Sequence, residues 1–166
     1  NLIKNKANII GVANQFSNQL EYTLKLCELI KKINKETIIV IGGPHASSFP
    51  KDLLKNNFID YVVVGEGEYV FSNLVENLSK KKDVTKIKGL AFKKDGKFIV
   101  NKLELIENLD ELPFPNYDLI NLENYFKIYK EGYEARPDCP SDYRVISMIT
   151  SRGCPFNCIF CAIHPH

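Results

Sequence analysis

The stretch TIIVIGGPH, residues 37–45, decides the fold. Five β-branched residues in succession favour a strand buried on both faces, and the two glycines and the proline end it. A similar run, YVVVGEGE, occupies residues 61–68, and a third apolar run occupies residues 7–13. Each run is followed by a segment in which apolar residues recur at helical spacing. This alternation predicts an α/β fold, a parallel sheet with helices on both faces.

The helix expected after the first strand is amphipathic. Asn18 and Glu21 have the spacing of a capping box at a helix start. The predicted apolar face recurs at i, i+4, i+7, i+8 and i+11, as Tyr22, Leu26, Leu29, Ile30 and Ile33. Two leucines and Cys27 widen this face. Because a free cysteine packs as a small hydrophobe, Cys27 is predicted to lie in the core.

Glycine-rich turns follow two of the strands. In sheets of this kind, ligands bind beyond the carboxyl ends of the strands. Gly42 and Gly43 follow the second strand, and GEGE, residues 65–68, follows the third. Without a Cβ these positions let a flat ligand approach the backbone, although they could also be plain tight turns. A dinucleotide site is not favoured, since two neighbouring carboxylates would repel a pyrophosphate.

A cysteine motif lies near the end of the sequence. Cys154, Cys158 and Cys161 have C-x3-C-x2-C spacing after an apolar run at residues 145–149 that is typical of a strand. Three thiolates on one short loop predict a metal or cluster site. A four-iron cluster with three cysteine ligands keeps one iron open for an exogenous ligand. The alternative is a structural zinc ion completed by His164.

The segment SRGCPFNCIFC, residues 151–161, resembles the cluster-binding loop of the radical S-adenosylmethionine superfamily, which follows the first strand of a partial (β/α) barrel. The resemblance implies that Cys154, Cys158 and Cys161 hold a [4Fe-4S] cluster. It also implies that Phe160 packs near the adenine of S-adenosylmethionine. In that superfamily one electron from the cluster cleaves S-adenosylmethionine to a 5'-deoxyadenosyl radical.

A second resemblance covers the glycine turns. GGPHAS, residues 42–47, and DYVVVGEGE, residues 60–68, are similar to the cobalamin-binding domain that precedes the radical barrel in one large class of these enzymes. The implied fold is a flavodoxin-like (Rossmann-like) sheet. The implied cobalamin contacts are Gly42, Gly43, His45, Gly65 and Glu66. The place of His45 does not suit a cobalt ligand, so a hydrogen bond or a turn contact is expected of it.

The same resemblance predicts which strands are present. The strand at residues 7–13 corresponds to the third of five, so the first two strands are expected to precede it. Since the strand order of this fold is 2-1-3-4-5, the outer edge of that strand should be unpaired, and either exposed or covered by a partner chain. The chain is therefore expected to be a fragment of a larger enzyme.

Three regions are predicted along the chain. Residues 1–101 form the incomplete cobalamin-binding-type domain and end in a β-hairpin at residues 90–100 with an Asp-Gly turn. Residues 102–144 form a linker region stiffened by the prolines of LDELPFP. Residues 145–166 begin a truncated radical S-adenosylmethionine barrel.

Composition limits the class of protein. The chain has 166 residues, 45% of them hydrophobic and 25% charged, with a formal net charge of +2, as in an ordinary globular protein. Its short lysine clusters are interpreted as solvated faces, and no nucleic-acid partner is expected. No apolar run approaches the roughly 20 residues that span a bilayer, and the start does not resemble a signal peptide. We expect a cytoplasmic location without a membrane partner.

These features predict a cobalamin-dependent radical S-adenosylmethionine enzyme, sensitive to oxygen, that transfers a methyl group to an unactivated carbon of a small molecule. One alternative is an oxidative cyclisation or rearrangement. Another is a cobalamin carrier or sensor with structural zinc. An electron donor such as flavodoxin or ferredoxin is expected. The chain alone is predicted to be inactive, since a barrel needs several more βα units of roughly 30 residues each.

Overall fold

The computed structural model describes residues 7–132, 144, 146, 148–149, 151–154, 156 and 158–159. Contacts divide the chain into two compact units. The first comprises residues 1–107 and 157–166, and the second comprises residues 108–156.

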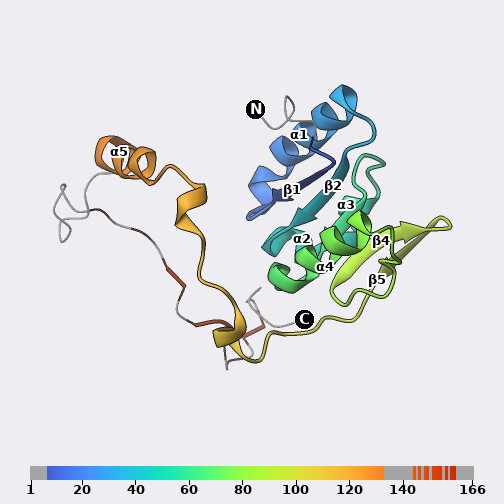
Figure 1. The fold of residues 1–166 in the computed structure, drawn as a ribbon. Coiled ribbons are helices and arrows are strands. Elements are labelled where there is room, and N and C mark those ends of the chain that lie inside the picture. The colour runs from blue at the N-terminus through green and yellow to red at the C-terminus, as the bar shows by residue number, and fades with distance from the viewer. Residues whose placement is uncertain are drawn as a thin grey trace. The chain divides into compact units, whose positions relative to one another are not determined.

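The first unit contains a five-stranded sheet in the order β1-β2-β3-β4-β5 (Figure 1). The strands are β1 (Ile9–Ala13), β2 (Ile38–Gly42), β3 (Tyr61–Val63), β4 (Leu90–Lys94) and β5 (Lys97–Val100). The first three are parallel, which confirms the predicted sheet. The predicted hairpin forms β4 and β5, and it extends the sheet antiparallel to β3, a pairing that the sequence did not specify.

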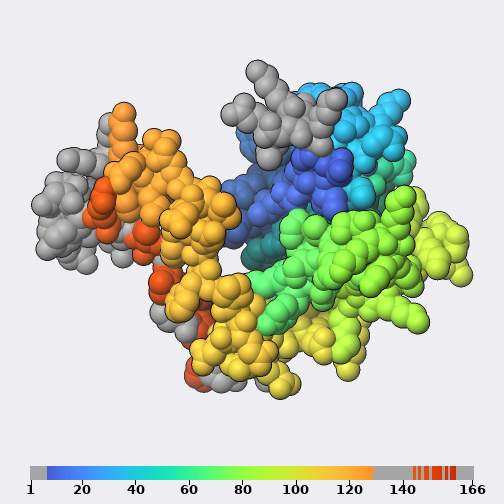
Figure 2. Space-filling view, viewed as in Figure 1, coloured from blue at the N-terminus to red at the C-terminus, as the bar shows by residue number. Residues whose placement is uncertain are grey.

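Helices cover both faces of this sheet, as predicted. On one face lie α1 (Leu20–Ile33), α2 (Pro44–Ser48) and α3 (Pro50–Leu54), and on the other lies α4 (Gly67–Ser79). Alternate residues of β2 point to opposite faces, so Ile39 and Ile41 join the first core and Val40 joins the second. The surface of α4, on its own side of the sheet, is the green region of Figure 2.

The outer edge of β1 is open. Within the part of the chain that the structure describes, β1 pairs with β2 alone, in register from Ile9 and Ile38 to Ala13 and Gly42. This confirms the predicted unpaired edge, which leaves a row of main-chain donors and acceptors available to another strand.

The predicted start of α1 is wrong. Asn18 lies within a short 3-10 turn, η1 (Ser17–Gln19), and α1 begins at Leu20 without a side-chain cap, so no capping box forms.

The predicted buried face of α1 is also wrong. The helix buries Thr23, Cys27 and Ile30, whereas four of the five predicted residues are exposed: Tyr22, Leu26, Leu29 and Ile33. The buried face carries Cys27 and Ile30, and beside them the Thr23 hydroxyl accepts a hydrogen bond from the buried amide of Asn14, at 3.2 Å. The same amide also donates to the carbonyl of Phe16, and it would be costly to bury without such partners.

Cys27 lies in the core, as predicted, with no exposed surface. Burial removes the thiol from water and raises its pKa to about 11, because the thiolate would be desolvated. Cys27 is therefore protonated at neutral pH and unsuited to metal binding.

The hairpin turn between β4 and β5 is also confirmed. Asp95 and Gly96 both have positive φ, at 49° and 76°, as a two-residue turn of this type requires.

The second unit is built of short helical segments, η2 (Leu109–Glu111), η3 (Tyr117–Leu119) and α5 (Leu122–Gly132). The side chains of Asn108 and Asn116 each accept a hydrogen bond from the backbone N–H two residues later, which starts each 3-10 turn. None of the helices in the described ranges is long and apolar enough to cross a membrane. The predicted domain boundaries at residues 101 and 144 remain predictions.

Two neighbouring residues test the orientation of α1. Ile30 is 6% exposed and Leu29 is 52% exposed. We expect Ile30→Ala to lower the free energy of unfolding by about 2–4 kcal/mol, because it leaves a cavity in the core. Leu29→Ala should cost less than about 1 kcal/mol. Chemical denaturation measures both, and equal losses would contradict the observed rotation of the helix.

Candidate functional site

The loops at the carboxyl ends of β1 and β2 are joined by one buried residue. Asn14 follows β1 directly and has no exposed surface. Its N–H donates to the carbonyl of Gly42 at 2.8 Å, and its carbonyl accepts from the N–H of His45 at 3.3 Å. Its side-chain Oδ1 has no hydrogen-bond partner among the described residues. The main chain of Asn14 is therefore hydrogen-bonded to the residues before and after Gly43. The side-chain oxygen of Asn14 stays unsatisfied among the described residues.

Gly43 has to be a glycine. It precedes α2 with φ at 105°, and a Cβ there would lie 2.7 Å from the carbonyl oxygen of Asn14. Gly42 differs, because its Cβ would make only an ordinary contact of 3.7 Å with Val63. The tight-turn interpretation therefore explains Gly43, whereas the packing of this unit does not require a glycine at position 42.

Ser47 connects the second loop to the third. Its hydroxyl accepts from the N–H of Gly65 at 2.9 Å and donates to the carbonyl of Gly43 at 3.1 Å. Gly65 follows β3 with φ at 80°, which favours glycine. A single side chain thus fixes the spacing between the two glycine turns.

Glu66 has a structural contact. One of its carboxylate oxygens accepts a hydrogen bond from the N–H of Ile106 at 2.6 Å. A Cβ on Gly65 would clash with a methyl group of Leu103. The segment after the hairpin is therefore held against the third loop, and Glu66 helps to hold it.

His45 is half-buried and oriented by its neighbours. Its Nδ1 is 2.9 Å from the hydroxyl of Ser17, and its ring centroid is 5.2 Å from that of Phe49. The sequence predicted a hydrogen bond or a turn contact for this histidine, and the bond to Ser17 is of the first kind. Its role as a cobalamin contact remains a prediction.

The structure thus brings all five predicted cofactor residues to one edge of the sheet, on the loops after β2 and β3. Sequence reasoning missed Asn14 and Ser47, which hold these loops together. A polar residue directly after an apolar strand was the available signal for Asn14, and Ser47 stood within the motif GGPHAS. Together these residues form a rim, defined here as residues 14–17, 42–47 and 65–67.

Two of the three motif cysteines lie within the described residues. Cys154 and Cys158 are exposed, and neither is in a disulfide. Gly153 has φ at 81°, with open space where its Cβ would be. Cys161 and Phe160 lie outside the described residues, as does His164. The described residues contain no group of three metal-binding side chains, so the predicted cluster site remains a prediction.

The fold and the rim define an α/β domain in which loops with glycine turns meet at the carboxyl ends of the parallel strands, the edge where such sheets bind ligands. Residues 1–75 match the family model of the B12 binding domain. The glycine turns and the half-buried His45 are compatible with cobalamin, a flat ring system with many amide groups, whereas the unsatisfied Asn14 Oδ1 is fully buried.

Curated relatives extend the comparison over nearly the whole chain. Uncharacterized methyltransferase PH0819 of Pyrococcus horikoshii is 37% identical over an alignment of 158 residues, and the match covers 93% of this chain and 31% of that protein. Cytidylyl-2-hydroxyethylphosphonate methyltransferase of Streptomyces wedmorensis is 32% identical, covering 92% of this chain and 32% of that protein. The chain spans about a third of the length of these relatives.

A solved structure supports the fold. The cobalamin-dependent S-adenosylmethionine radical enzyme OxsB, with aqua-cobalamin and S-adenosylmethionine bound, superposes with a TM-score of 0.59. It is 22% identical, and the match covers 71% of this chain and 17% of that chain. The chain belongs to the family of cobalamin-dependent radical S-adenosylmethionine enzymes.

Gly43 provides a test of the rim. Gly43→Ala combines a left-handed backbone with a clash against Asn14, so we expect a loss of roughly 2 kcal/mol or more in unfolding free energy. Gly96→Ala is the matched control, because Gly96 also has positive φ but nothing within 4 Å of its missing Cβ. It should cost only about 1 kcal/mol. Equal costs measured by denaturation would show that the contact with Asn14 is unimportant.

Proposed function

We propose that this chain is the cobalamin-binding domain and cluster loop of a radical S-adenosylmethionine methyltransferase that acts on an unactivated carbon of a small molecule. The observation that carries the proposal is the similarity to two methyltransferases over more than nine-tenths of the chain. The rim of glycine turns at the ligand edge of a B12-binding fold supports it independently.

The protein residues bind and orient, while the cofactors supply electron transfer, radical formation and methyl transfer when bound. The main chain at Gly42 and Gly43 would contact cobalamin, in the turn that Gly43 makes possible. Asn14 and Ser47 would hold the loops at fixed spacing before the cofactor binds, which lowers the entropy cost of binding.

The cluster would be held by three thiolates, from Cys154, Cys158 and Cys161. Cys154 and Cys158 are exposed thiols, as a loop that receives a cluster after folding requires. Because S-adenosylmethionine cleavage consumes an electron, the proposal includes a reduced flavodoxin or ferredoxin as donor. It also includes a cytoplasmic location, where thiols stay reduced.

Adjacent serines test cobalamin binding. We expect Ser47→Ala to weaken hydroxocobalamin binding roughly tenfold, because the loops after β2 and β3 lose their connection. Ser48→Ala is the control, since its hydroxyl donates only to the carbonyl of Pro44 and it is exposed. Titration of the purified protein, followed by visible absorption, measures both. Equal affinities of the two variants would argue against the rim as the binding site.

The cysteines test the cluster and the reaction. After anaerobic reconstitution of the complete enzyme with iron, sulfide and cobalamin, we expect bound iron and sulfide. Reduction with S-adenosylmethionine and substrate should yield both 5'-deoxyadenosine and S-adenosylhomocysteine. Cys158→Ala should abolish 5'-deoxyadenosine formation, whereas Cys27→Ala should retain it, since Cys27 is a buried core residue.

Two outcomes would overturn this proposal in different ways. One bound zinc ion without sulfide would favour a cobalamin carrier or sensor. Formation of 5'-deoxyadenosine without S-adenosylhomocysteine would favour a cyclisation or rearrangement over methyl transfer.

A further inference from the structure

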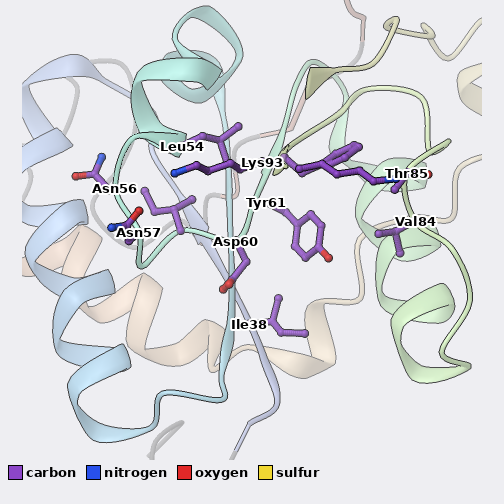
Figure 3. Close-up of a pocket in the computed structure, with 12 residues that line it drawn as sticks. Ile38, Leu54, Asn56, Asn57, Asp60, Tyr61, Val84, Thr85 and Lys93 are labelled. Atoms are coloured by element: carbon purple, nitrogen blue, oxygen red, sulfur yellow. The ribbon is translucent and has the colours of Figure 1, made fainter. Parts of the chain in front are cut away.

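A groove lies at the opposite edge of the sheet from the rim. It has a volume of about 440 Å³ and lies where β2 and β3 begin and β4 ends (Figure 3). Its walls combine buried apolar residues with exposed polar ones. The apolar residues that line it include Leu54, Ile59, Val84 and Phe92. The groove does not involve the loops proposed to hold cobalamin.

Among the described residues that line the groove there is one carboxylate, Asp60, and its charge is balanced by an ion pair. Asp60 forms an ion pair with Lys31 at 2.8 Å and accepts the N–H of Ile39 at 2.7 Å. Burial, with a smaller contribution from Asp60, raises the pKa of Tyr61, so its phenol is neutral. Lys93 and Lys94 also line the groove, and neither forms an ion pair with another described residue. The groove therefore presents a net positive charge.

The positive charge extends well beyond the groove. Residues 80–102 contain nine lysines and two aspartates, a net charge of +7, and all nine lysines are exposed. The rest of the chain has thirteen lysines and arginines against eighteen aspartates and glutamates, a net charge of −5. In the described residues only Lys80 and Lys88 of the nine form ion pairs, with Glu76 and Glu104.

Several of these lysines lie near the groove because of the sheet topology. Lys88 and Lys102 are at the other end of β4, next to Gly89, whose carbonyl accepts a hydrogen bond from the N–H of Val64. The end of α4 and the tip of the β4–β5 hairpin both lie at the edge where β3 begins, and the hairpin projects from this unit (Figure 1). Lys94 lies directly opposite Lys97 across the hairpin, and a like-charged pair in that position is destabilising. Asp83 and Asp95 are the acidic residues of this region, and Asp83 interacts with Lys86 and Lys94.

We propose that the groove and the surrounding lysines bind an acidic segment of a partner protein. Aspartates and glutamates of that segment would pair with the unpaired lysines, and one apolar side chain would enter the groove. Charge of one sign over such a surface speeds association and selects partners of the opposite sign. This inference does not depend on the proposed methyl transfer.

The residue types favour a protein over a nucleic acid. Residues 80–102 contain no arginine, although arginine forms the bidentate contacts typical of phosphate and base recognition. The aromatic residues nearest the lysines are buried or half-buried: Phe92, Phe98 and Tyr61. They offer no exposed rings on which bases could stack.

Selection from a random peptide library tests the inference. Displayed peptides of about twelve residues are selected on the purified protein at low salt. We expect the enriched peptides to be acidic, to carry an aromatic or aliphatic residue, and to bind roughly tenfold more weakly to the double variant Lys93→Glu/Lys94→Glu. Asn57 is an exposed residue that lines the groove, and Asn57→Trp should weaken binding to a similar degree through steric obstruction.

The control carries the same change in charge elsewhere. Lys25→Glu/Lys32→Glu reverses two exposed lysines of α1 and should change peptide affinity less than about twofold. Peptides without acidic enrichment, equal losses in the two double variants, or no loss in Asn57→Trp would overturn the inference. Tighter binding of a random RNA pool than of the selected peptides would also overturn it, in favour of a nucleic acid. Thermal melting confirms that each variant is folded.

Discussion

The structure of the ligand edge depends on the main chain of Asn14. Its N–H and its carbonyl bond to residues on either side of Gly43, so the chain after β2 must turn within van der Waals distance of that carbonyl. Only a residue without a Cβ allows both this approach and a φ of 105°. The side chain of Asn14 also donates a hydrogen bond to the Thr23 hydroxyl, on the buried face of α1. One buried polar residue therefore contacts both a turn and a helix.

The sheet could be predicted from the sequence because its signals are local. Runs of valine and isoleucine specify buried strands, and Asp95-Gly96 specifies a two-residue turn. The buried face of α1 could not be predicted, since apolar spacing gave Leu29 and Ile30 equal weight. Which of the two is buried depends on contacts such as that between Thr23 and Asn14, which joins residues that only the tertiary fold brings together.

The site was predicted only in part, because some of its residues have local sequence signals and others act through tertiary contacts. The glycine turns and His45 were identified by their place after strands, and the structure puts them on one edge. The residues that hold this edge together, Asn14 and Ser47, act through hydrogen bonds between loops that no spacing rule reveals. The two edges of the sheet thus have different properties. Loops with glycine turns meet at the carboxyl ends of the parallel strands, while Lys93 and Lys94 line a groove at the amino ends.

Hydrogen–deuterium exchange with and without hydroxocobalamin tests the central claim, that the rim holds cobalamin, most directly. If the rim holds cobalamin, we expect slower exchange on cofactor addition in residues 14–17, 42–47 and 65–67. Exchange at residues 55–61 and 92–97 should be unchanged. Slower exchange at the amino-end groove alone, or no change in any of these segments at a saturating concentration of cofactor, would contradict it.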